Sequence, residues 1–417
     1  MRIAVIGAGV SGLVAAHQLH RAGHELSVFE AAAYAGGHTN TVRIDEPDAA
    51  LDVDTGFIVF NDRNYPNFER LLDRLGVASQ PSDMSFGVGD EDGDFEYAST
   101  SANGLFAKRA HLASPAFHKM VFDVRRFQRE ACALLSSDED PSLAEWLRDT
   151  RFSDAFVDKL IVPQAAAVWS ADPEQMWSFP ARFLVQFFDN HGMLDLKERP
   201  KWRVIQGGSK RYVEALTAPF GDAIRLRTPV ESVVRTDGDV TITPRGGEPE
   251  SYDHVVLAVH ADQALAILGA DATARERDLL GAFPFAPNEA VLHHDERLLP
   301  RRRRAWASWN YHLLSTPTGR PAVTYHMNRL QSLRSDRQWC VTLNRTEAID
   351  PAKIVRTIQY AHPVFTVAGM RAQERVGEIS GGRGRTHFCG AYWGWGFHED
   401  GVVSGLRVAR DLGAATS

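Results

Sequence analysis

Three glycines near the start of the chain, Gly7, Gly9 and Gly12, follow an apolar stretch and precede an amphipathic one. In a strand-to-helix turn, glycines at this spacing permit a tight bend, let the backbone approach a pyrophosphate and let the helix pack closely on the strand. The free N–H groups and the positive dipole end of such a helix bind phosphate oxygens. Glu30 follows these glycines at the spacing along the sequence at which an acidic residue accepts hydrogen bonds from a ribose diol. Together these residues predict a dinucleotide-binding site.

The same segment also predicts the secondary structure that would hold these residues in place. Apolar periodicity indicates a strand over Arg2–Ile6, a helix over about Val10–Arg21, and a second strand over Glu25–Phe29. This βαβ unit explains the segment better than a signal peptide, whose cleavage would remove the first strand. No other uncharged apolar stretch approaches the roughly 18 residues of a membrane span, so we expect a cytoplasmic protein.

The composition is that of an ordered globular chain. Its 417 residues, 44% hydrophobic and 24% charged, exceed what one core organises, so we expect two intertwined domains. A net charge of −7 argues against a nucleic-acid partner. Cys132, Cys340 and Cys389 are far apart and form no CxxC motif, so the sequence predicts neither a disulfide framework nor a metal site, and it favours a reducing compartment.

A second glycine-rich stretch, GAYWGWGFHEDG, covers residues 390–401. Its glycines allow backbone to lie against a large planar ligand. Trp393, Trp395 and Phe397 offer flat apolar surface, which favours an apolar substrate chamber over ordinary core packing when the three are taken as a set.

A glycine pair, Gly36-Gly37, comes soon after Glu30 and is followed at some distance by VDTGFIVF. This pattern resembles the superfamily of FAD-dependent amine oxidases and phytoene desaturases, whose members carry a glycine pair here so that the chain can pass close to FAD. The resemblance continues in VIQGGSKRYVEAL, RTPVESVV, YDHVVLAVHADQAL and THFCGAYWGWGFHEDGVVSGLRVA. It implies FAD rather than NAD as the dinucleotide.

Contacts with FAD along the whole chain follow from the resemblance. It implies that the Val230 backbone meets the adenine, that Gly390 meets the phosphates, and that a helix starting near Gly401 points its N-terminal amides at the isoalloxazine ring. The expected cofactor-binding residues are Gly7, Gly9, Val10, Ser11, Gly12, Glu30, Gly36, Gly37, His38, Thr39, Gly56, Val230, Ala258, Gly390, Gly401, Val402 and Val403. Many members carry arginine where this chain has His38. The position of the covalent tether in some amine oxidases holds no cysteine here, so we expect non-covalent FAD.

The fold implied by the resemblance is α/β, with a Rossmann-like, three-layer FAD-binding domain of the glutathione-reductase type interleaved with an α+β substrate domain. We expect residues 1–60, 204–269 and 372–417 in the FAD-binding domain, and residues 61–203 and 270–371 in the substrate domain. The first substrate segment is rich in helical patterns. The second consists of short strands, EAVLHHD, AWASWNYH, AVTYHM and WCVTLN, which predict an antiparallel sheet.

The chain resembles one branch of the superfamily more closely, in the stretches DTGFIVFNDRNYPN, AWASWNYH, NRLQ and VTLN. This branch holds predicted NAD/FAD-binding oxidoreductases associated with cyclopropane-fatty-acid-synthase-type methyltransferases. It implies a fatty-acyl or modified lipid substrate and a lipid methyltransferase as partner. The basic run Arg301–Arg304, beside Trp306, suggests weak peripheral contact with an anionic membrane.

The chemistry requires a hydride to leave a carbon that faces the flavin. His398, Trp395 and Tyr325 are the candidate catalytic residues, and Tyr392, His326, Asn310, Tyr311 and Asn61 are further polar groups within the same stretches. Amine oxidases of this superfamily often use a lysine near the flavin, and no lysine can be assigned to that role here. We therefore expect a dehydrogenase (desaturase) of acyl chains. The alternatives are an amine oxidase, a flavin-dependent isomerase and a non-catalytic flavoprotein partner of a methyltransferase.

Overall fold

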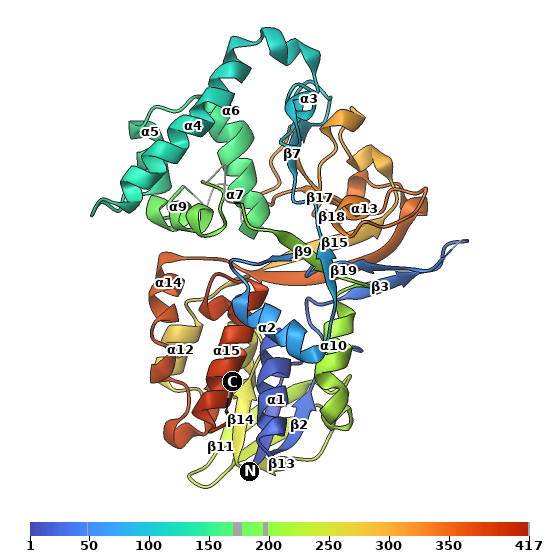
Figure 1. Ribbon diagram of the computed structural model, residues 1–417. Helices are drawn as coiled ribbons and strands as arrows, with labels where there is room; N and C mark the ends of the chain where they lie inside the picture. The colour runs from blue at the N-terminus through green and yellow to red at the C-terminus, as the bar shows by residue number, and fades with distance from the viewer. Residues whose placement is uncertain (48, 170–176, 195–198, 416–417) are drawn as a thin grey trace.

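The computed structural model describes residues 1–47, 49–169, 177–194 and 199–415. Two bodies are visible in Figure 1. The first is built around a parallel sheet and holds both chain ends, and the second is built around a larger mixed sheet with a cap of helices. We call them the parallel-sheet body and the mixed-sheet body. No helix among the described residues combines the length and the apolar character needed to cross a membrane.

The parallel-sheet body is built on five parallel strands in the order β10-β2-β1-β14-β20. These strands are β1 (Arg2–Ile6), β2 (Glu25–Phe29), β10 (Ile224–Arg225), β14 (His254–Leu257) and β20 (Thr386–Phe388). Helices α1 (Val10–Arg21), α10 (Lys210–Thr217) and α15 (His398–Asp411) contribute to the hydrophobic cluster on one face. The predicted βαβ unit is confirmed, with the same bounds for both strands and the helix.

An antiparallel sheet covers the other face of these five strands. It consists of β11 (Val230–Arg235), β12 (Val240–Pro244) and β13 (Glu250–Tyr252), with α11 (Ala261–Leu268) and α12 (Ala274–Leu280) beside it. Val233 and Ile242 of this sheet share a buried cluster with Ala4 and Leu257 of the parallel sheet. Helices, parallel sheet and antiparallel sheet therefore form the three layers that the sequence predicted.

The mixed-sheet body contains seven strands in the order β19-β15-β18-β17-β16-β7-β8. They are β7 (Phe86–Asp90), β8 (Glu96–Ala98), β15 (Phe285–His293), β16 (Trp309–Leu313), β17 (Val323–His326), β18 (Cys340–Leu343) and β19 (Ile354–Pro363). All pairs are antiparallel except β16–β7, which is parallel. The expected antiparallel sheet is thus present but mixed, because β7 and β8 join it from the segment predicted to be helical.

Helices cap the mixed sheet. They are α3 (Ala102–Leu105), α4 (Pro115–Leu135), α5 (Leu143–Asp149), α6 (Asp154–Phe156), α7 (Val162–Trp169), α9 (Ala181–Asn190) and α13 (Met327–Leu330). The α4 helix begins at Pro115, and the Ser114 side chain accepts a hydrogen bond from the Phe117 N–H. Proline at the first position and serine at the N-cap are strong start signals. In Figure 1, α4 forms the outer edge of this body.

Further small elements lie between or beside the two bodies. They are β3 (Thr41–Ile44), β4 (Leu51–Asp54), β5 (Phe60–Asn61), β6 (Ser79–Pro81), β9 (Trp202–Ile205), α2 (Pro66–Leu75) and α14 (Val367–Gln373). Two helices from the segments predicted for the substrate domain pack on the parallel-sheet body instead: Phe68 and Leu72 of α2 join the cluster of α1, and Leu279 of α12 joins the cluster of β11. Each helix buries its apolar face against the nearest complementary surface, whichever segment it comes from.

Candidate cofactor and substrate site

The turn between β1 and α1 is packed so tightly that two of its glycines cannot carry a side chain. Gly7 has φ +101°, and a Cβ there would lie 2.5 Å from the Ala258 carbonyl oxygen. A Cβ on Gly12 would lie 2.1 Å from the Gly7 oxygen. At Gly9, by contrast, an added Cβ meets nothing within 4 Å. The open side of the turn is therefore at Gly9, where the sequence predicted the pyrophosphate.

The N-terminus of α1 opens toward this space. Its N-cap is Gly9, which offers no side chain to the first amides of the helix, those of Val10, Ser11 and Gly12. Such amides lack acceptors within the helix and bind anions. The α15 helix crosses α1 closely, since a Cβ on Gly401 would lie 2.6 Å from Val10 Cγ1.

The chain that follows β20 is tied to α15. The Gly390 N–H donates to the Ser404 hydroxyl oxygen at 3.1 Å, which ties the end of β20 to α15. Val402 is buried, whereas Val403 is 42% exposed. Val403 therefore lies at the surface of α15.

The glycine pair lies directly over the turn. The Gly36 N–H donates to the Ala8 oxygen at 2.7 Å, and a Cβ on Gly37 would lie 3.1 Å from Gly9 Cα. Gly36 and Gly37 have φ of +131° and +59°, which glycine adopts at low cost. This loop and the β1–α1 turn form two sides of one cradle.

Glu30 lies at the end of β2, beside the cradle. Its two carboxylate oxygens accept hydrogen bonds from the Ala8 and Ala32 N–H groups, each at 2.8 Å. The Glu30 backbone carbonyl oxygen accepts a hydrogen bond from the Thr228 N–H at 2.8 Å, which brings the start of β11 and Val230 to this edge. A carboxylate has about four acceptor sites, so capacity remains for a ribose diol.

His38 is the clearest polar group without a partner. Its ring is buried and stacks on Tyr360 of β19 at 4.7 Å between centroids, with His362 at 5.1 Å. Among the described residues, His38 Nε2 has no hydrogen-bond partner. Burial, followed by the nearby His362, holds the pKa of His38 well below its usual value. A buried donor or acceptor without a partner is costly, so we expect His38 Nε2 to bond an atom of a bound ligand. Together with the open side of Gly9, it fits FAD.

The loop that follows His38 is held by the β19 side chains. A Cβ on Gly56 would lie 2.2 Å from the His38 carbonyl oxygen and 3.2 Å from the Tyr360 hydroxyl oxygen. Thr39 Oγ1 lies 2.7 Å from the Tyr212 hydroxyl oxygen. Spacing along the sequence contains no signal for Tyr360 or Tyr212, because both come from elements far away in the chain.

His398 is the first residue of α15, three residues before the helix start expected near Gly401, and it is buried. Its Nε2 lies 2.6 Å from the Tyr212 hydroxyl oxygen, and its ring stacks on Phe57 with centroids 3.6 Å apart. Burial lowers the pKa of His398 to about 3. A neutral imidazole whose Nε2 already bonds a tyrosine orients the start of α15.

Asp54 is a buried carboxylate that sequence reasoning missed. It accepts hydrogen bonds from the Ser209 N–H and hydroxyl, at 2.9 and 2.7 Å, from the Thr41 hydroxyl at 2.5 Å and from the Gln331 amide at 3.1 Å. Ser209 follows the glycine pair Gly207-Gly208, and Gln331 directly follows α13. Asp54 therefore holds the segment before Gly56 to both bodies. An aspartate within VDTGF gives no sign in the sequence of these distant donors.

The aromatic residues of the C-terminal stretch separate into two groups. Trp395 stacks on Phe183 of α9 at 4.5 Å, and Phe397 stacks on Phe187 at 5.5 Å. Trp393 instead packs edge-on against Phe283, at 5.0 Å, in the core of the parallel-sheet body. The three rings do not line one chamber as a set. We call Trp395, Phe397, Phe183 and Phe187 the α9 aromatic cluster.

Tyr325 lies on β17 in the mixed-sheet body. It is buried, and its ring packs edge-on against Trp309 at 4.8 Å. Burial raises the pKa of its phenol. It shares the large core cluster of this body with the α9 aromatic cluster, and no contact joins it directly to Trp395 or His398 in the described part of the chain.

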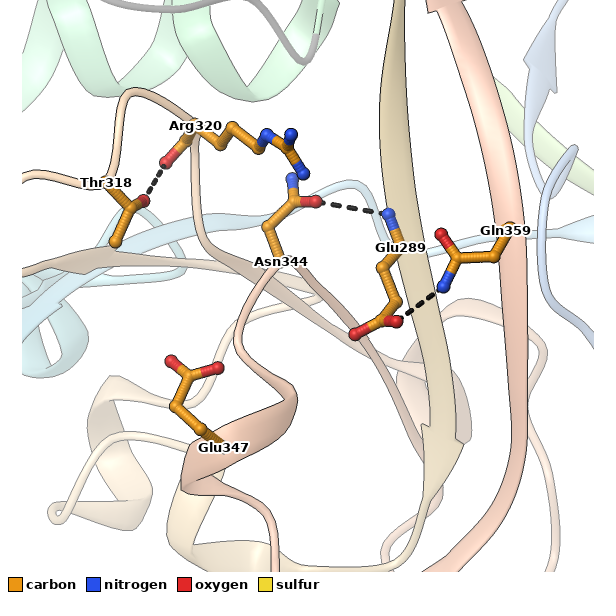
Figure 2. Close-up of a pocket in the computed structure, with 6 residues that line it drawn as sticks. All are labelled: Glu289, Thr318, Arg320, Asn344, Glu347 and Gln359. Carbon is orange, nitrogen blue, oxygen red and sulfur yellow. Dashed lines mark hydrogen bonds between the residues drawn. The ribbon is translucent and has the colours of Figure 1, made fainter.

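A separate hollow of about 340 Å³ lies on the mixed-sheet body. Figure 2 shows its polar lining, in which the Glu289 carboxylate bonds the Gln359 amide at 2.5 Å and the Glu289 N–H donates to the Asn344 side-chain oxygen at 3.1 Å. None of its residues was predicted as a site residue. Because the polar groups of the lining bond one another, this hollow differs from the cradle around Gly9.

Comparison with known proteins finds flavin-dependent oxidases among the relatives. The chain is 25% identical over 281 residues to the flavin-dependent L-tryptophan oxidase RebO of Lentzea aerocolonigenes, which covers 62% of this chain and 58% of that protein. It is 24% identical over 273 residues to AofH of Mycobacterium tuberculosis, assigned as a flavin-containing monoamine oxidase, covering 64% of this chain and 58% of AofH. The chain thus spans somewhat more than half the length of these relatives.

Solved structures agree in fold. Putrescine oxidase bound to putrescine superposes with a TM-score of 0.70 at 17% identity, covering 100% of both chains. A fatty acid isomerase from P. acnes that produces CLA superposes with a TM-score of 0.69 at 18% identity, covering 98% of both chains. The predicted α/β fold with a Rossmann-type FAD domain and a sheet-containing substrate domain is confirmed.

A family model described as "Flavin containing amine oxidoreductase" matches residues 10–293, more than half of the chain. This match confirms the superfamily and the FAD cofactor predicted from the sequence. The chain belongs to the family of flavin containing amine oxidoreductases.

Proposed function

We propose that this protein is an FAD-dependent oxidoreductase that dehydrogenates a long apolar substrate, a fatty-acyl or modified lipid chain. The observation that carries the proposal is the α9 aromatic cluster beside the start of α15, where Trp395 and Phe183 remain partly exposed. Aromatic faces of this kind bind methylene chains through apolar contact. They carry no carboxylate to pair with an ammonium group, although a ring face also attracts a cation.

The residues of the cradle would bind FAD without a covalent bond. The α1 amides beside Gly9 would hold the diphosphate, Glu30 the ribose, and His38 Nε2 an acceptor atom of the cofactor. When bound, FAD supplies the acceptor for a hydride equivalent from the substrate. The positive dipole end of α15 would stabilise negative charge beside it. Heat or acid should release free FAD; flavin that remains with the precipitated protein would contradict non-covalent binding.

Among the candidate catalytic residues, we assign different roles. His398 positions the start of α15 through its bond to Tyr212. Trp395 forms an apolar wall that orients the substrate chain. Tyr325, which is buried in the mixed-sheet body, stays a candidate catalytic residue.

Amine oxidation is the second candidate, since the family match favours it. The strands of the mixed sheet contain no lysine within their described bounds, so the lysine that many amine oxidases of this superfamily use is missing from that sheet. This feature favours the acyl substrate. The same proposal includes a cytoplasmic location and a lipid methyltransferase as partner. A test of association between the two proteins would check the partnership.

Anaerobic titration of the FAD-loaded protein separates the candidates. Fatty-acyl compounds should bleach the oxidised flavin spectrum, whereas matched primary and secondary amines should leave it unchanged. Product without bleaching would indicate isomerisation. Fast bleaching by amines, with no response to acyl compounds, would replace the lipid proposal by amine oxidation.

A further inference from the structure

The outer side of α4 carries an exposed apolar residue of unusual size. Phe122 is 68% exposed, and Leu112, in the short 3-10 helix Arg109–Ala113 before α4, is 55% exposed. These are the two most exposed large apolar side chains of the described residues. His118 Nε2 lies 2.9 Å from the Leu112 carbonyl oxygen, which fixes the 3-10 helix against α4.

Positive charge flanks Phe122 on the same side of the helix. Lys119 and Arg125 lie three residues before and after it, a spacing that places side chains on one helix face. Both are exposed, and neither has an ion-pair partner among the residues that the structure describes. We define the α4 face as Leu112, His118, Lys119, Phe122 and Arg125.

This local charge contrasts with the rest of the molecule. The whole chain has a net charge of −7. The acidic run 138–140 lies beyond the far end of α4 at Leu135, which is 13 residues, or about 20 Å of helix, from Phe122. The α4 face is therefore a basic and apolar area on an acidic protein.

The basic run Arg301–Arg304 has a different environment. Arg302 Nη1 lies 2.8 Å from a Glu96 carboxylate oxygen, and the Arg301 N–H donates to Glu96 at 2.6 Å. Arg303 pairs with Glu296 at 3.5 Å. Two of the four guanidinium groups thus have a carboxylate partner, and Trp306 beside them is only half-exposed, so this run is a weaker candidate for lipid contact than its sequence suggested.

The inner side of α4 leads toward the α9 aromatic cluster. Phe117, Met120 and Phe127 on this side are buried, and α4 packs on α9, which supplies Phe183 and Phe187. One layer of helices thus separates the α4 face from the aromatic residues beside α15.

We propose that the α4 face docks onto an anionic phospholipid bilayer. Phe122 and Leu112 enter the headgroup boundary, and Lys119 and Arg125 contact lipid phosphates. Apolar insertion combined with attraction to anionic lipid is how helices that lie on a bilayer bind it. Delivery of an acyl chain through this surface rests on the proposed function, whereas bilayer binding itself does not.

Flotation of the FAD-loaded protein with phosphatidylcholine vesicles, with and without phosphatidylglycerol, tests the proposal without any turnover. We expect binding only to the vesicles that contain phosphatidylglycerol, and loss of binding in high salt. Lys119→Gln combined with Arg125→Gln should lower the partition coefficient about thirtyfold. Phe122→Ser should lower it about tenfold.

Matched controls come from other surfaces of the same chain. Val234 is an exposed apolar residue on β11, and Arg304 is an exposed cation of the arginine run, so Val234→Ser and Arg304→Gln should bind as the unchanged protein does. Binding that follows Arg304 rather than the α4 face would overturn the proposal, as would absence of binding to anionic vesicles. A dimer that Phe122→Ser dissociates would also overturn it, because a second copy would then cover the face. An enzyme that oxidises amines yet floats with anionic vesicles would contradict only the proposed function.

Discussion

The parallel-sheet body and the mixed-sheet body present their functional groups in different ways. In the first, the cradle is made of backbone: the turn around Gly9, the glycine pair and the amides of α1. In the second, the surface beside α15 is made of side chains, the α9 aromatic cluster. A site made of backbone depends on a few glycines at fixed spacing, whereas a site made of side chains depends on residues brought together from distant segments.

Substitution of two glycines in the same turn should produce the largest effects, and of two different kinds. A Cβ on Gly12 would lie 2.1 Å from the Gly7 oxygen, so Gly12→Val should lower the free energy of unfolding by about 3 kcal/mol or more. A Cβ on Gly9 meets no protein atom within 4 Å, so Gly9→Val should fold normally and fail to retain FAD. Thermal unfolding of the apoprotein and FAD titration measure the two effects. A Gly9→Val protein that purifies loaded with FAD would place the diphosphate elsewhere.

Glu30→Ala should have the next largest effect, on FAD affinity. It removes a carboxylate that accepts hydrogen bonds from the Ala8 and Ala32 N–H groups and would accept those of a ribose diol. The expected loss is about 2 kcal/mol of binding free energy, measured by flavin fluorescence quenching. Glu30→Gln keeps one acceptor oxygen and should lose less. Equal FAD affinity in all three proteins would remove Glu30 from the cofactor site.

Acid should destabilise both bodies through buried neutral histidines. Burial lowers the pKa of His398, in the parallel-sheet body, and of His312, in the mixed-sheet body, to about 3 in each case, from an ordinary value of 6.5. Between pH 6.5 and 3 the unfolded chain binds more protons, so this stability is complete above pH 6.5 and falls as the pH falls. Each histidine contributes a slope of about 1.4 kcal/mol per pH unit.

Denaturant unfolding between pH 7.5 and 4.5 measures that slope. His398→Gln and His312→Gln should each reduce it by the same amount if the two bodies unfold as one unit. A reduction in only one of two separate transitions would show that the bodies unfold independently, which sharpens the contrast between them.

Local patterns predicted the parallel-sheet body well, because its information is local. The bounds of β1, α1 and β2 follow from an apolar strand, a glycine turn and an amphipathic helix. The sequence did not predict β19, whose exposed and polar positions weaken the alternation of a strand, nor the contacts of His398 and Asp54 with Tyr212 and Ser209. Those contacts join residues more than 150 positions apart, and no pattern within a segment encodes them.

The smallest predicted effect, that of one methylene group, tests the side-chain site most directly. Each methylene buried on binding contributes about 0.8 kcal/mol, so affinity for fatty-acyl compounds, followed through the oxidised flavin spectrum, should rise about fourfold per added methylene until the site is filled. Trp395→Ala should flatten this dependence, because Trp395 stacks on Phe183 in the α9 aromatic cluster. Trp393→Ala is the matched control: this ring packs on Phe283 in the parallel-sheet body, so its loss should lower stability and leave the chain-length dependence unchanged. If both tryptophan variants keep the full dependence, the substrate lies away from the α9 aromatic cluster, and the observation on which the proposed function rests no longer supports it.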